Sequence, residues 1–258
     1  MTPEAMRSAW RNDGFFYMRG MVKPDLVRRI EAEVIAAIRA DPPEKHPDEI
    51  AYLSGSDYYI YPEKRPSATA VNAEDRIAKV FNCHVFGATR AVAQRKDIVD
   101  IVAQLLGEPD IDCFQSQFIF KNPGVIGQPW HQDSYYFPFE PARPVVGLWL
   151  AVTEATLENG CLHVLPGSHA EPVHEHIPDR RPNANYGYVE IVDHDMAAAV
   201  PVLMQPGDLL LFDSHLMHRS TDNESTGVRA AMVYHYASAG TVDRRNSPIN
   251  DFVPVRRA

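Results

Sequence analysis

The spacing of apolar residues changes near Cys113, and this change limits the possible folds more than any other feature of the chain. Before Cys113, apolar residues recur about every 3.6 positions, which predicts amphipathic helices over 24–40 and 91–106. After Cys113, short runs with a period of two are separated by turn signals such as Asn159-Gly160. The first part of the chain is therefore expected to be helical and the second part to form strands.

Helices followed by many short strands predict a mainly β fold with N-terminal helices. We expect a double-stranded β-helix, which is a jelly-roll or cupin-like barrel around a small pocket, with a helical outer layer. A single domain over 1–258 should contain helical support in 1–110, the β-helix core in 111–240 and a C-terminal extension in 241–258. The expected strands are 113–121, 145–152, 162–165, 186–191, 201–204, 208–212 and 228–236.

Charge and hydrophobicity exclude several kinds of partner. The 258 residues include 25 Lys or Arg and 34 Asp or Glu, and the net charge of -9 argues against nucleic acid and anionic lipid. No stretch approaches the roughly 18 to 20 apolar residues of a membrane-spanning helix. With only three cysteines, the chain does not resemble a disulfide-rich secreted scaffold. We expect a cytoplasmic protein with a small-molecule partner, whose oligomeric state the sequence leaves open.

Among eleven histidines, His131 and His218 have the context of metal ligands. His131 and Asp133 are two residues apart, so both side chains project to one face of an extended segment. A distant histidine, for which His218 is the best candidate, would complete two imidazoles and one carboxylate on one face of an octahedral ion. The opposite face would be open to a cosubstrate and dioxygen. The H-x-D pattern alone is common by chance, so its context decides.

That context is an arginine and a serine on the predicted inner face. Ser220 follows His218 inward because alternate residues of a strand share a face, and the polar loop 222–227 lets Arg229 point inward as well. A buried arginine needs an anion, and its planar fork suits a carboxylate. We expect a dicarboxylate such as 2-oxoglutarate, with one end on the metal and the other on Arg229 and Ser220. Without such a ligand, Arg229 would be a surface ion-pair residue.

Several motifs in order along the chain resemble one known family. They are HQDSYYFPF at 131–139, Trp149, NGCL at 159–162 and LPGSH at 165–169. This set closely resembles the phytanoyl-CoA dioxygenase family of iron(II)- and 2-oxoglutarate-dependent oxygenases, which are built on a double-stranded β-helix. The similarity extends from about Asp13 to Ala239.

The resemblance assigns roles to particular residues. It implies that iron(II) is bound by His131, Asp133 and His218, and that Lys79, Gln117, Trp149, Ser220 and Arg229 contact 2-oxoglutarate. Lys79 and Gln117 lie where the alignment crosses segments of variable length. Gln117 has separate support, since a glutamine directed into a barrel is costly unless it is paired. Lys79 could equally be a solvated lysine, and Trp149 could be core packing.

The implied reaction consumes dioxygen and 2-oxoglutarate, releases succinate and carbon dioxide, and hydroxylates an unactivated C–H bond of a small organic substrate. Asp133 matters here because related halogenases have a small residue in place of this carboxylate. Hydroxylation, desaturation or cyclisation is therefore preferred to halogenation. The alternative is a cupin-like isomerase, hydrolase or ligand-binding protein that uses a metal without redox chemistry. Such a protein would not need Arg229 and Ser220.

The segment 171–195 is rich in proline and charged residues, which predicts a long loop at the barrel mouth. It could act as a lid that presents Arg180 or Arg181 to an anionic substrate, or it could be a solvent-exposed surface loop without such a role. The family acts on acyl-CoA thioesters, amino acids, phosphonates and natural products, so the fold does not select among them. The sequence leaves the substrate and the stereochemical outcome open.

Overall fold

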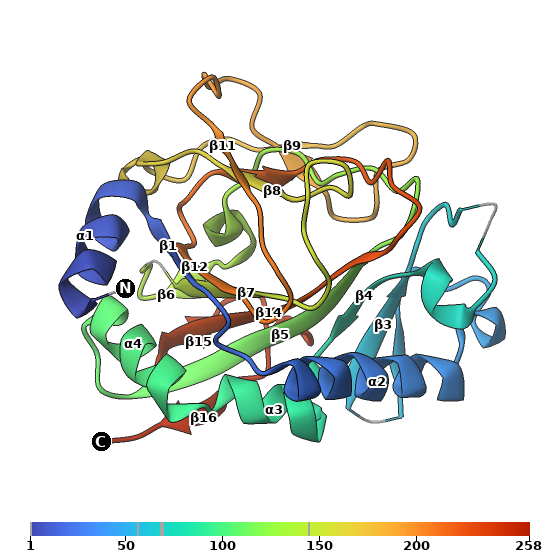
Figure 1. Ribbon diagram of the computed structural model, residues 1–258, viewed down its shortest axis with the longest axis horizontal. Coiled ribbons are helices and arrows are strands. Elements are labelled where there is room, and N and C mark those ends of the chain that lie inside the picture. The colour runs from blue at the N-terminus through green and yellow to red at the C-terminus, as the bar shows by residue number, and fades with distance from the viewer. Residues whose placement is uncertain (1, 56, 68–69, 144) are drawn as a thin grey trace.

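The computed structural model describes residues 2–55, 57–67, 70–143 and 145–258. One large antiparallel sheet forms the centre of the molecule (Figure 1). Strand β16 (Val253–Arg256) pairs with β5 (Ile111–Lys121) and joins the sheet in this way. In spatial order the sheet contains β1 (Phe15–Met18), β12 (Leu209–Asp213), β7 (Val146–Ala151), β14 (Arg229–Ser238), β5 (Ile111–Lys121), β4 (Ile77–Phe81), β3 (Tyr58–Pro62) and β2 (Tyr52–Ser54), with β16 at Val253–Arg256.

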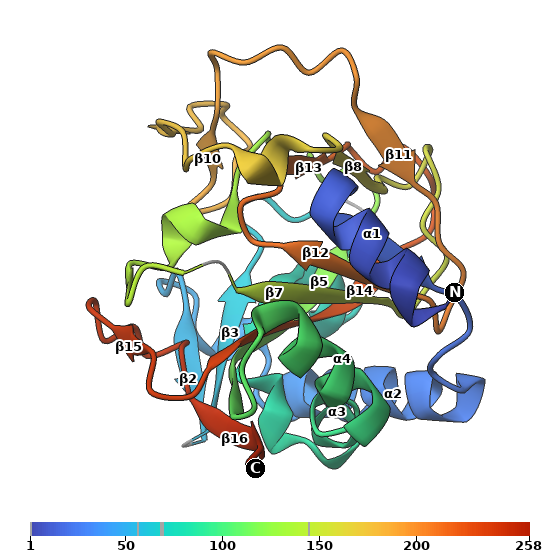
Figure 2. The same cartoon turned by 90° about the vertical axis from the view of Figure 1, so that its left-hand side faces the viewer.

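A smaller antiparallel sheet lies above the large one (Figures 1 and 2). It runs β11 (Val200–Val202), β8 (Leu162–Val164), β13 (His218–Ser220), and a backbone bridge from His218 to His131 continues it. Two further pairs are β9 (Ile177–Pro178) with β10 (Val189–Glu190) and β6 (Phe139–Glu140) with β15 (Val242–Asp243). The facing sheets confirm the predicted double-stranded β-helix.

Helices cover the outer face of the large sheet, as Figure 2 shows for α2, α3 and α4. The bounds are α1 (Pro3–Asp13), α2 (Pro24–Ala40), α3 (Gly87–Ala93) and α4 (Lys96–Leu106), with short 3-10 helices η1 (Pro43–Lys45), η2 (Ala73–Arg76), η3 (Cys83–Val85), η4 (Asp133–Tyr136) and η5 (Ser168–Ala170). Helix α2 has the predicted bounds. The helix predicted over 91–106 is divided instead, because Arg95 takes an extended conformation and caps α4, while its side chain pairs with Asp97.

Alternation along the central strands creates two apolar layers. On β7, Leu148 and Leu150 pack in the layer beneath the helices, while Trp149 packs between the sheets. On β14, Met232 likewise belongs to the helical layer, and Val233 to the layer between the sheets. Arg229 is four residues before Val233 on the same strand, so both side chains point to the same face. The Arg229 side chain therefore points between the sheets, as the alternation predicted.

The ends of the chain contribute more strands than the sequence indicated. Strands β1 to β4 lie within 1–110, so this region extends the sheet as well as supporting it. The predicted strand 186–191 shrinks to β10, because Gly187 has a left-handed backbone (φ 79°) that interrupts extended structure. Within the described ranges, every helix is too short or too polar to cross a bilayer.

Candidate metal centre and cosubstrate pocket

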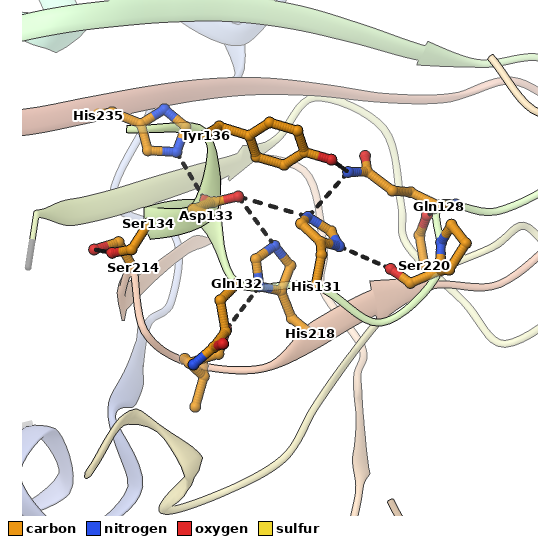
Figure 3. Close-up of polar contacts among 12 residues, drawn as sticks. Gln128, His131, Gln132, Asp133, Ser134, Tyr136, Ser214, His218, Ser220 and His235 are labelled. Carbon is orange, nitrogen blue, oxygen red and sulfur yellow. Dashed lines mark hydrogen bonds and ion pairs between the residues drawn. The ribbon is translucent and has the colours of Figure 1, made fainter. Parts of the chain in front are cut away.

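His131, Asp133 and His218 converge where the two sheets face each other (Figure 3). The Nε2 atoms of His131 and His218 lie 3.5 and 3.7 Å from Oδ1 of Asp133, and all three residues are buried. Paired backbone hydrogen bonds of 2.9 and 3.0 Å between His131 and His218 fix the distance between the two strands. Residues 87 positions apart are thereby held side by side.

The tautomers of both histidines suit a metal. Nδ1 of His131 donates to the carbonyl of Pro129 at 2.8 Å, and Nδ1 of His218 donates to that of Leu216 at 3.0 Å. Nε2 of each ring therefore faces Asp133, and Nε2 of His131 also lies 3.1 Å from the side-chain amide nitrogen of Gln128. Burial, together with the nearby His131, lowers the pKa of His218 to about 4, so His218 is neutral at pH 7. Two lone pairs and a carboxylate oxygen, closely spaced and buried, fit a divalent cation such as iron(II).

A cationic region lies at the other end of the same cavity. Arg229 is 2% exposed, its guanidinium lies 5.6 Å from the ring centre of Trp149, and its Nε has no hydrogen-bond partner among the described residues. Lys121 stands opposite Arg229 in the β14–β5 register. Burial lowers the pKa of Arg229 to about 10 and that of Lys79 to about 8. Because burial disfavours the charged forms of these two side chains, an anionic ligand in the cavity would stabilise them.

Ser220 is held so that its hydroxyl proton is free. Its Oγ accepts hydrogen bonds from Nζ of Lys121 at 2.8 Å and from the backbone N–H of Gln128 at 3.1 Å. Both lone pairs are thus used, and the single O–H can donate to a carboxylate in the cavity. Neither Lys121 nor Gln128 was predicted from the sequence, where the one available signal was that Lys121 ends a predicted strand with several apolar residues.

The cavity encloses about 350 Å³, within the usual range for small-molecule sites. The structure brings all the residues singled out for metal or cosubstrate contact to its wall: Lys79, Gln117, His131, Asp133, Trp149, His218, Ser220 and Arg229. It also adds Tyr136 and Tyr188, which the sequence did not assign to the site, and it places Arg245 on the wall, where the sequence allowed either a pocket or a surface position.

A directional chain of side-chain amides runs along one wall of the cavity. Asn250 donates to the Asp243 carboxylate at 2.8 Å, Gln115 donates to Asn250 at 2.8 Å, and Gln117 donates to Gln115 at 3.4 Å. Since a carboxylate only accepts, Asp243 sets the orientation of each amide in turn. Oε1 of Gln117 is left buried without a partner in the described part of the chain. This atom calls for a hydrogen-bond donor, which 2-oxoglutarate does not have.

The arginines expected on a lid are placed elsewhere. Arg181 forms an ion pair with Asp179 at 2.8 Å and donates to the carbonyl of Gly127, and neither Arg180 nor Arg181 lines the cavity. Contact of either arginine with a substrate has no support from the cavity lining and stays a prediction. The same loop does reach the cavity through 185–188.

Comparisons with known proteins agree with this geometry. The phytanoyl-CoA dioxygenase family pattern matches residues 10–231. A probable phytanoyl-CoA dioxygenase of Caenorhabditis elegans is 36% identical over 149 residues, covering 55% of this chain and 48% of that protein. The chain thus matches about half the length of that relative. A phytanoyl-CoA dioxygenase domain-containing protein 1 of Danio rerio is 27% identical over 257 residues, covering 88% and 87% of the two chains.

A solved structure shows the same fold. The epimerase SnoN, crystallised with Fe3+, alpha ketoglutarate and nogalamycin RO, superposes with a TM-score of 0.64 at 19% identity, covering 93% of this chain and 85% of SnoN. The match across residues 10–231 settles the family, and iron(II) with 2-oxoglutarate is the cofactor pair of that family. The chain belongs to the phytanoyl-CoA dioxygenase family of iron(II)- and 2-oxoglutarate-dependent oxygenases.

Proposed function

We propose that this protein is a dioxygenase that hydroxylates an unactivated C–H bond of a small organic substrate while converting 2-oxoglutarate to succinate and carbon dioxide. One observation carries the proposal. A cluster of two histidines and one carboxylate shares a cavity with a buried arginine that has no ion-pair partner among the described residues. A non-redox metal protein would have no use for that arginine.

Each group has a distinct part in this proposal. His131, Asp133 and His218 would hold iron(II), which when bound supplies the oxidising chemistry together with dioxygen and 2-oxoglutarate. Arg229 would bind the distal carboxylate of 2-oxoglutarate, and Ser220 would donate its hydroxyl proton to the same group. Trp149 would form an apolar wall that keeps water from the Arg229 guanidinium.

Hydroxylation is the outcome we favour because Asp133 fills the third ligand position. Because the Asp133 carboxylate occupies this position, the position is not open to a halide. The fold alone does not fix the outcome, since the structural relative SnoN is described as an epimerase. A cytoplasmic location remains our prediction.

The substrate end of the cavity supports a polar, anionic substrate. Gln117 offers a buried carbonyl that needs a donor, so we assign this carbonyl to a hydroxyl or amine of the substrate. Arg245 is exposed and lines the cavity, so it would meet an anionic group of the substrate. Arg245→Gln should raise the Michaelis constant for carboxylate-bearing substrates and leave neutral analogues unchanged. Equal effects on both would exclude the anionic assignment.

The central experiment measures succinate formation with iron(II), 2-oxoglutarate and a panel of candidate substrates. His131→Ala, Asp133→Ala and His218→Ala should each abolish succinate formation, since the cluster has only these three ligands among the described residues. In parallel, 2-oxoglutarate is titrated into anaerobic iron(II) protein, where chelation gives a visible absorption band. Metal binding with neither this band nor succinate would support the non-redox alternative instead.

A further inference from the structure

A second group of potential metal ligands lies outside the cavity, at the two ends of the loop that follows η5. Oε2 of Glu171 is 2.9 Å from Nε2 of His174 and 3.0 Å from Nε2 of His194. The three ligand atoms lie within 4.8 Å of one another. Their side chains are 39%, 26% and 19% exposed, so an ion could reach them from solvent. None of the three lines the cavity that contains His131.

The hydrogen bonding of His194 calls for a cation at this position. Nδ1 of His194 lies 3.0 Å from the carbonyl oxygen of Asp195 and therefore carries the proton. In a neutral ring, Nε2 would then direct a lone pair at the Glu171 carboxylate, which places two acceptors in contact. A metal ion or a second proton must separate them. His131 and His218 show the same pattern, since their Nδ1 atoms also donate to backbone carbonyls.

The spacing suits a small divalent ion. Ligand atoms at about 2.1 Å from a tetrahedral ion lie about 3.4 Å apart. The observed 2.9 and 3.0 Å would open by about half an ångström on binding, which partly exposed side chains can accommodate. Two imidazoles and a carboxylate form a donor set that zinc takes with a water molecule as fourth ligand.

We propose that Glu171, His174 and His194 form a second metal site, for zinc or a similar divalent transition-metal ion. This site does not depend on the proposed oxygenase activity. The bound ion would connect the two ends of the loop 171–194, whose residues 185–188 line the cavity. It would therefore restrain a wall of the cavity without belonging to the reaction centre.

The same loop also contacts the residue between two proposed iron ligands. The backbone N–H of His174 donates to Oε1 of Gln132 at 2.8 Å, and Gln132 donates in turn to the carbonyl of Pro172 at 3.1 Å. Nε2 of His176 accepts from the backbone N–H of Gln132 at 3.0 Å. An ion that orders this loop should therefore also restrain the segment that carries His131 and Asp133.

Zinc stoichiometry tests the proposal on the full chain. After removal of all metal, titration with zinc should give two equivalents for the unaltered protein. One should remain in the His174→Ala/His194→Ala double variant, and one in the His131→Ala/His218→Ala double variant. Glu171→Gln, which keeps the shape of the side chain, should weaken the second site at least tenfold. His46→Ala is the matched control, because its Nε2 meets Asp41 at 3.0 Å and the described residues place no third ligand beside the pair.

A protease measurement gives an independent readout. Zinc should slow cleavage within 175–193 in the unaltered protein and in the His131→Ala/His218→Ala variant, but not in the His174→Ala/His194→Ala variant. The proposal is overturned if the unaltered protein binds a single equivalent that only the His131→Ala/His218→Ala change removes. The cluster would then be a protonated hydrogen-bond network.

Discussion

Nε2 of His235 lies 2.9 Å from Oδ2 of Asp133, while Oδ1 is the carboxylate oxygen near His131 and His218. The His235 ring is 2% exposed and touches the rings of Phe114 and Phe137, with centroids 5.9 and 5.0 Å away. Its N–H therefore has a fixed direction. His235 is a positioning residue that holds one oxygen of Asp133 and leaves the other for the metal.

Replacing His235 should weaken metal binding without removing a ligand. His235→Phe is expected to reduce iron(II) affinity about 10- to 100-fold, because Asp133 would lose the hydrogen bond that orients it. Competition with a chelator of known affinity measures the change. His163→Phe is the control, since His163 is half-buried on β8 and does not line the cavity. Equal iron affinity in folded His235→Phe and unaltered protein would contradict this role.

Arg229 should matter to the cosubstrate far more than to the metal. Loss of its charge-assisted hydrogen bonds in Arg229→Ala is expected to cost about 1.5 to 3 kcal/mol, or roughly 10- to 150-fold in 2-oxoglutarate affinity. Titration of 2-oxoglutarate into the iron-loaded variant measures it. Arg219→Ala is a control from β13, where the guanidinium lies 5.2 Å from the ring centre of Trp130 and outside the cavity lining. An unchanged 2-oxoglutarate affinity in Arg229→Ala would mean that Arg229 does not bind the distal carboxylate.

The sequence predicted those features that depend on local spacing. His131 and Asp133 are neighbours on one extended segment, and the inward direction of Arg229 follows from alternation along β14. Both need only the period of a strand. His218 was the best candidate for the distant partner because of its Ser220 and Arg229 context, and the family resemblance implied the same residue.

Contacts between distant strands could not be predicted in this way. Lys121 meets Ser220 across 99 positions, and His235 meets Asp133 across 102, so both depend on the register of the sheets. For the loop arginine even a local contact could not be predicted, because composition shows the charge of Arg181 but not its ion pair with Asp179, two residues away.

Lys121 should act on the cosubstrate through Ser220. Its Nζ donates to Oγ of Ser220 at 2.8 Å and to the carbonyl of Thr221 at 2.6 Å, so Lys121→Met should leave the Ser220 hydroxyl free to rotate. We expect 2-oxoglutarate affinity to fall about fivefold to tenfold, which corresponds to one hydrogen bond of about 1 to 1.4 kcal/mol.

A double-mutant cycle tests whether Lys121 affects 2-oxoglutarate affinity through Ser220 or directly. If Lys121 works through Ser220, the Lys121→Met/Ser220→Ala pair should bind 2-oxoglutarate little worse than Ser220→Ala alone. Effects that multiply would instead mean that Lys121 contacts the carboxylate directly. Iron(II) affinity serves as the internal control, and it should stay constant through the cycle.

Glu63 should make the stability of the protein depend on pH. It is 6% exposed, accepts a hydrogen bond from Asn185 at 2.8 Å, and burial raises its pKa from 4.5 to about 7. Between these two values the folded protein holds a proton that the unfolded chain releases. The contribution of Glu63 to stability is therefore full below pH 4.5 and is lost as the pH rises to about 7, by up to about 3 kcal/mol.

Glu63→Gln removes this titration but keeps an acceptor for Asn185. Relative to the unaltered protein, the variant should gain free energy of unfolding between pH 5 and pH 8, toward the 3 kcal/mol limit. Urea unfolding at both pH values measures the difference, which cancels groups that titrate in both proteins. Glu158→Gln, at an exposed position, should show no such change. The opposite outcome is that the two proteins differ in free energy of unfolding by the same amount at both pH values. That result would mean that Glu63 titrates alike in the folded and unfolded states.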